Sequence, residues 1–183
     1  MKIGFIVGSL RKGSVSKKIA ETLKGLFPAG HDLELIEIGD LPIYNEDLDN
    51  GNLALPKAYT TFRNKMKTVD AIVFVTPEYN RSVPAALKNA LDVGSRPYGS
   101  SVWGGKPALV VSQSPSNLSG FGANHHLRQT LVFLNVYPLQ QPEVYLANSF
   151  GLFDENGKMN NEGTLKFLQS VVDAFLVHIK RFK

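Results

Sequence analysis

The sequence contains no cysteine among its 183 residues. Disulfides, thiolate nucleophiles, iron–sulfur clusters and zinc–thiolate sites are therefore excluded. It also has no apolar run close to the roughly 18 residues that a membrane helix needs. The apolar stretch Ile3–Val7 is too short for a signal peptide. We therefore expect a cytoplasmic chain without a membrane partner.

Blocks of like charge, low-complexity stretches and internal repeats are absent as well. The net charge is +4 and the pI about 9.2, but the basic residues are scattered, which argues against a nucleic-acid partner. Mild basicity suits anionic small molecules such as nucleotides, and it is also what an ordinary solvated surface shows. The length and the 43% hydrophobic content indicate one globular domain over residues 1–183.

Short apolar runs rich in β-branched residues alternate with stretches in which apolar residues recur at helical spacing. This alternation is typical of an α/β fold with a parallel, doubly wound sheet covered by helices on both faces. We predict strands at 3–7, 33–38, 71–75, 107–111 and 143–146. The predicted helices run from Ser14 to before Pro28, over 55–68, across Leu87–Leu91, over 124–134 and over 165–179.

The loop from Gly8 to Ser16 joins the first strand to the first helix. Free backbone N–H groups and the positive end of a helix attract phosphate at such a position. Side-chain hydroxyls and a guanidinium can add hydrogen bonds to an anion. The competing interpretation is that the serine at the helix start only caps the helix while the cations face solvent. The candidate phosphate-binding side chains are Ser9, Arg11, Ser14 and Ser16.

Two well-known phosphate loops can be tested against this segment. Gly8 and Gly13 have the spacing of a Walker A loop, but Ser14 stands where that loop needs a lysine. The glycine pattern of a dinucleotide-binding loop is absent too. The loop is therefore better suited to a monophosphate than to a triphosphate or a pyrophosphate.

A second candidate loop, residues 76–84, follows the third predicted strand and lies on the same sheet edge. Pro77 and Pro84 stiffen it, and Pro84 favours the first turn of the next helix. With Tyr79 and exposed backbone N–H groups it could border a flat ring. The alternative is a well-capped connection in which Tyr79 packs on the sheet edge.

Taken together, these segments resemble the NADPH-dependent FMN reductase family, in particular its bacterial chromate and quinone reductases. The likeness spans nearly the whole chain, and the co-occurrence of the two loops makes it specific. The segments that carry it are Gly8–Arg11 with Ser14 and Ser16, Pro77–Asn80, Leu87–Asp92, Ser95-Arg96, Gly105–Pro107 and His126–Gln129.

The resemblance implies a flavodoxin-like fold with five strands in the order 2-1-3-4-5, bound FMN, and a homodimer or homotetramer. It implies ping-pong hydride transfer from NADPH or NADH through flavin N5 to small acceptors: quinones, chromate, azo compounds or free flavin. No catalytic side chain and no metal site are expected. By position, Ser9, Arg11 and Ser16 would hold the phosphate with Ser14 close by, and Pro77, Glu78, Tyr79 and Asn80 would line the isoalloxazine.

Two segments depart from the family's pattern: relatives often have Asn at the position of Ser16, and a glycine-richer run than residues 112–117. The main alternative function is a non-enzymatic FMN electron carrier of the flavodoxin type, and a further one is a flavin-free binding module. The pI of about 9.2 and Arg11 favour the enzyme over the carrier. The long polar loop 39–52 is a candidate cover over the site. Trp103 is a candidate to reach the flavin of a neighbouring subunit.

Overall fold

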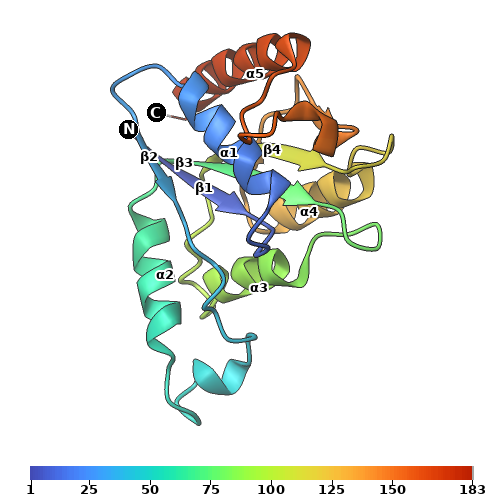
Figure 1. The fold of residues 1–183 in the computed structure, drawn as a ribbon. Helices are drawn as coiled ribbons and strands as arrows, with labels where there is room; N and C mark the ends of the chain where they lie inside the picture. Colours follow the sequence, from blue (N-terminus) through green and yellow to red (C-terminus); the bar gives the residue numbers. More distant parts are fainter. Residues whose placement is uncertain (183) are drawn as a thin grey trace.

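A computed structural model describes residues 1–182 of the chain (Figure 1). Its centre is a parallel sheet with strand order β2-β1-β3-β4-β5, and β6 pairs with β4 as well. This confirms the doubly wound, flavodoxin-like topology expected from the sequence. The strands are β1 (Lys2–Val7), β2 (Asp32–Leu35), β3 (Ala71–Pro77), β4 (Pro107–Gln113), β5 (Tyr137–Pro138) and β6 (Val144–Leu146).

Helices cover both faces of this sheet (Figure 1). The α-helices are α1 (Val15–Leu26), α2 (Lys57–Lys67), α3 (Ala85–Gly94), α4 (Phe121–Phe133) and α5 (Glu162–Lys180). Two short 3₁₀ helices, η1 (Glu46–Leu48) and η2 (Ser149–Leu152), lie in connecting segments.

Alternate residues of each buried strand supply two separate cores, because side chains of a strand point to opposite faces. Ile6 and Phe74 pack with α2, α3 and α4 on one face. Phe5, Val73 and Val75 pack with α1 and α5 on the other. Strands that are buried on both faces read as continuous apolar runs, which is why the sequence located them well.

The fifth position of the sheet differs from the expectation of one strand at 143–146. Two short strands, β5 and β6, pair with different parts of β4. Pro138 and Pro142 have no N–H to donate, so one unbroken ladder cannot run through this segment. The predicted strand is therefore present as β6, and β5 is an additional pairing.

The loop 39–52 is fixed to α2 and α3 on one side of the molecule. Arg63 of α2 donates to both carboxylate oxygens of Asp49, at 2.7 and 2.6 Å, and both side chains are at most 10% exposed. Asn89 of α3 donates to the carbonyls of Leu41 and Pro42 at 3.1 and 2.9 Å. Such a bidentate pair and the amide contacts hold the loop in place. This loop is a packed element of the α2–α3 side.

Trp103 does not reach outward. Its side chain is fully buried, and its indole N–H donates to the carbonyl of Leu91 at 2.9 Å. The ring packs near Phe62 and Phe74 in the core. The prediction that Trp103 reaches a neighbouring subunit's flavin is therefore wrong. Sequence position placed it in a loop, but the apolar area of an indole favours burial wherever its N–H finds an acceptor.

Candidate functional site

The loops after β1, β3 and β4 meet beyond the carboxyl ends of these strands, where ligands bind in doubly wound sheets. They enclose a cavity of about 250 Å³. Ser16 and Asn80 are the two predicted site residues that do not line it. The lining residues are Ser9, Arg11, Ser14, Val15, Pro77, Glu78, Tyr79, Gln113, Pro115 and Phe150.

The turn between β1 and α1 presents unpaired donors. Within residues 1–182, the backbone N–H groups from Ser9 to Gly13 have no protein acceptor, whereas Ser14 N–H donates to the carbonyl of Arg11. Arg11 is exposed and takes part in no ion pair with another described residue. Free N–H groups, an unpaired guanidinium and a helix N-terminus favour an anion at the same point.

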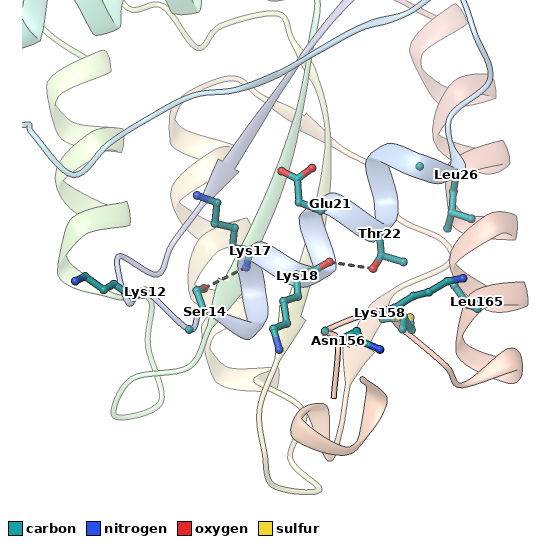
Figure 2. Close-up of a pocket in the computed structure, with 14 residues that line it drawn as sticks. Lys12, Ser14, Lys17, Lys18, Glu21, Thr22, Leu26, Asn156, Lys158 and Leu165 are labelled. Carbon is teal, nitrogen blue, oxygen red and sulfur yellow. Dashed lines mark hydrogen bonds between the residues drawn. The ribbon is translucent and has the colours of Figure 1, made fainter. Parts of the chain in front are cut away.

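The serines of this turn have different surroundings. Ser14 is the N-cap of α1, and its Oγ accepts from Lys17 N–H at 3.1 Å (Figure 2). The capping role considered from the sequence is therefore real, but it uses only the oxygen and leaves the hydroxyl hydrogen free. Ser16 is fully buried behind the cavity wall, where its Oγ accepts from the amide of Gln113 at 3.0 Å.

The loop after β3 folds into a tight turn. The N–H of Tyr79 donates to the carbonyl of Ser82, and the N–H of Ser82 donates to the carbonyl of Tyr79, both at 2.9 Å. Between them Asn80 and Arg81 have φ of +50° and +65°, the pattern of a type I′ turn. Within the described chain the N–H groups of Asn80 and Arg81 have no protein acceptor. The loop thus offers backbone donors at the cavity rim.

The side chain of Glu78 is used to hold this loop against α4. Its carboxylate accepts from the N–H of Ala123 at 3.1 Å, in the first turn of α4, and pairs with Arg81 at 3.0 Å. The approach is close enough that a Cβ on Gly122 would lie 2.6 Å from the carbonyl oxygen of Arg81. A negative charge at a helix N-terminus is stabilising. Glu78 therefore faces α4, and what remains for a ligand is mainly backbone.

Four lining residues were not predicted as site residues: Val15, Gln113, Pro115 and Phe150. Gln113 ends β4, beside Pro77 of β3, and is only 5% exposed. Phe150 in η2 is 60% exposed and brings an aromatic ring to the cavity. Gln113 belongs to the segment 112–117, to which the sequence assigns no role. Phe150 lies in a short irregular stretch with no periodicity to mark it.

A larger hollow of about 570 Å³ lies along the outer side of α1, against the segment 156–159 and Leu165 of α5 (Figure 2). It has several basic side chains, but these splay apart: Lys12 and Lys17 extend to one side of α1, and Lys158 extends to the other (Figure 2). Binding of a small anion requires cations and donors that converge on one point. The smaller cavity at the sheet edge is therefore the better candidate site.

None of the helices in residues 1–182 is both long enough and apolar enough to cross a membrane. Over the same residues, histidines and carboxylates form no cluster of three or more that could hold a metal ion.

Comparison with known proteins places this geometry in a family. The profile of the NADPH-dependent FMN reductase family matches residues 1–151. The chain belongs to that family. A quinone reductase from Pseudomonas putida is 52% identical over 178 residues, which cover 97% of this chain and 94% of that protein. A 2-hydroxy-1,4-benzoquinone reductase from a Burkholderia species is 38% identical over 180 residues, covering 98% and 97%.

Among solved structures, the flavoenzyme NAD(P)H:(acceptor) oxidoreductase FerB from Paracoccus denitrificans superimposes with a TM-score of 0.91. It is 36% identical and covers 99% of this chain and 98% of its own. These comparisons confirm the family expected from the two loops. They also confirm the oxidoreductase class, with FMN as cofactor and a nicotinamide nucleotide as reductant.

Proposed function

We propose that this NADPH-dependent FMN reductase family member passes electrons from NADPH or NADH to quinone-type small molecules. FMN would bind at the cavity between the first turn and the loop after β3. The observation that carries the proposal is the turn itself, where N–H groups from Ser9 to Gly13 lack acceptors within the described residues 1–182, at the N-terminus of α1. Those donors fit a monophosphate, the group by which FMN differs from riboflavin.

Different residues would hold the phosphate and the isoalloxazine of the cofactor. Ser9, Arg11 and the free hydroxyl hydrogen of Ser14 would hold the phosphate, with the N–H groups of the turn. The isoalloxazine would lie against the segment Pro77–Asn80. Backbone donors at the turn after β3 would hydrogen-bond its polar edge, since the carboxylate of Glu78 is committed to α4.

When bound, FMN would supply the redox chemistry: hydride would be accepted at N5, and electrons would then pass to an acceptor that enters the same place in a ping-pong sequence. The protein's own contribution is to fix the phosphate, orient the ring and surround it with donors that favour negative charge. No side chain of the cavity is assigned as an acid or base. Tyr79 and Phe150, 55% and 60% exposed, would contact a flat acceptor at the mouth.

The candidate acceptors are quinones, chromate, azo compounds and free flavin. Quinones are proposed first because two relatives carry the names quinone reductase and 2-hydroxy-1,4-benzoquinone reductase. Purified protein should be yellow and should oxidise NADPH or NADH only when an acceptor is added. Steady-state rates with benzoquinone, chromate and an azo dye in parallel rank the acceptors. Parallel lines in double-reciprocal plots are the expected sign of the ping-pong order.

The main alternative remains an FMN electron carrier. A yellow protein that stays inert towards NADPH and NADH with every acceptor would establish the carrier and refute the enzyme. Protein that cannot be reconstituted with FMN would contradict both.

A homodimer or homotetramer is also proposed. Helix α4 supports it by leaving Val132 and Phe133 74% and 80% exposed, on a helix whose other side packs in the core. Light scattering after gel filtration measures the mass directly, and a single species of 20.1 kDa would refute the oligomer. A cytoplasmic location is proposed because the reductant is a nicotinamide nucleotide, and cell fractionation would test it.

A further inference from the structure

A short chain of buried polar groups crosses behind the cavity. Gln113 donates its Nε2 N–H to Ser16 Oγ at 3.0 Å, and its Oε1 accepts from Ser149 Oγ at 2.5 Å. Both serines are fully buried, and Gln113 is 5% exposed. The chain links the first turn of α1, the end of β4 and the start of η2, three elements far apart in the sequence.

The hydrogen-bonding capacity of Gln113 is only half used. A glutamine amide has two N–H donors and an oxygen with two lone pairs. Within residues 1–182, Gln113 spends one N–H on Ser16 and one lone pair on Ser149. The second N–H has no acceptor in the part of the chain that the structure describes. A buried donor without an acceptor is costly, so such a group calls for a ligand or water.

The amide with the free N–H belongs to a residue of the cavity wall. Gln113 lines the cavity together with Ser9, Arg11 and Ser14, whereas Ser16 does not line it. The amide is also held next to the first turn of α1, where the free N–H groups of the turn gather. Gln113 therefore stands between Ser16 and whatever occupies the anion-binding end of the cavity.

We propose that Gln113 contacts the cofactor, donating its second amide N–H to the phosphate end of FMN. Ser16 and Ser149 are then positioning residues that act through Gln113, because they fix the rotation of its amide from both sides. This inference rests on the FMN site proposed above. It also explains how a serine at position 16 can serve the phosphate site from outside the cavity.

The test compares two flavins that differ in the phosphate. Flavin-stripped protein is titrated with FMN and with riboflavin, and the quenching of flavin fluorescence gives each dissociation constant. For Gln113→Leu we expect FMN binding about 10- to 100-fold weaker and riboflavin binding within about twofold of the unchanged protein. Gln113→Glu keeps the shape but adds a negative charge, so its loss of FMN affinity should be larger still.

A matched control is Gln140→Leu, an exposed glutamine in the segment between β5 and β6, outside the cavity. It should leave both dissociation constants unchanged. Thermal melting of each variant shows that the fold is retained. If Gln113→Leu weakens FMN and riboflavin by the same factor, Gln113 only supports the packing and the inference is overturned.

A double-mutant cycle tests the positioning role. Ser16→Ala should weaken FMN binding about 3- to 10-fold in the otherwise unchanged protein and have no further effect on top of Gln113→Leu. An equal loss in both backgrounds would show that Ser16 meets the phosphate itself. If the unchanged protein binds neither flavin, the FMN site fails first. If it binds FMN and Gln113→Leu has no effect on it, only this inference fails.

Discussion

The two loops that line the cavity differ in whether their polar groups already have protein partners. In the turn from Gly8 to Ser16, the N–H groups of Ser9 to Gly13 and the guanidinium of Arg11 have no partner among residues 1–182. In the loop after β3, the side chain of Glu78 is tied to Ala123 and Arg81, and the backbone closes on itself between Tyr79 and Ser82. The first loop therefore keeps hydrogen-bond donors free for a ligand, whereas the second uses most of its polar groups for contacts within the protein.

The difference follows from what each loop is proposed to bind. A phosphate is a compact charge, so several hydrogen-bond donors that converge on it bind it strongly. A flat ring needs a rigid border more than it needs charge, and backbone donors on a fixed turn provide one. Changes in the first loop should therefore act on phosphate recognition alone, and changes in the second on stability and on flavin binding in general.

Removing the cation of the first loop should have the largest effect. Arg11→Ala should weaken FMN binding by about 1.5–3 kcal/mol, roughly 10- to 150-fold, and leave riboflavin nearly unchanged, because one charge-assisted contact to phosphate is lost. Titration by flavin fluorescence measures both. Lys12→Ala is the control, a neighbouring cation that does not line the cavity. Equal losses for the two variants would show that only the overall charge matters.

Crowding the second loop should act differently. Gly122→Ala places a Cβ 2.6 Å from the carbonyl oxygen of Arg81, so the loop must shift. We expect a loss of about 1–3 kcal/mol in the free energy of unfolding, and weaker binding of FMN and riboflavin by the same factor.

Gly25→Ala serves as the control, since its Cβ meets nothing within 4 Å and alanine favours the helix by up to about 1 kcal/mol. Denaturant unfolding compares the two glycine variants. A Gly122→Ala protein that discriminates against FMN alone would contradict the division between the loops.

The capping serine sharpens the comparison within the first loop. Ser14 and Asn161 both cap a helix by accepting an N–H three residues on, but only Ser14 lines the cavity. Replacing either with Ala should cost about 1 kcal/mol of stability. Only Ser14→Ala should also weaken FMN binding. Loss of FMN affinity in both variants would mean that helix stability, rather than the hydroxyl, controls binding.

The smallest effect is expected for Glu78→Gln. The amide oxygen can still accept from Ala123, but the interaction of the charge with the N-terminus of α4 and with the exposed Arg81 is lost. A decrease of about 0.5–1 kcal/mol in unfolding free energy follows, with the ratio of FMN to riboflavin affinity unchanged. A change in that ratio would place Glu78 among the phosphate-binding residues.

The sequence by itself determined the order of the main strands and helices, the absence of cysteine chemistry and the two loops that line the cavity. These features can be recognised locally, because buried strands are continuous apolar runs and each loop is a short contiguous segment. The boundaries that failed depend on distant partners. Helix α4 begins at Phe121 rather than at 124. Gly120 precedes it with a φ of +73°, and the carboxylate of Glu78 accepts an N–H of its first turn.

Only the tertiary structure decided which side chains face the cavity. Trp103 lies in the core and Ser16 lies behind the cavity wall, whereas Gln113 and Phe150 line the cavity. Ser16 and Gln113 are 97 residues apart, and Gln113 and Ser149 are 36 apart. No local pattern encodes such contacts, because they arise where parallel strands and their crossovers bring three loops to one edge of the sheet.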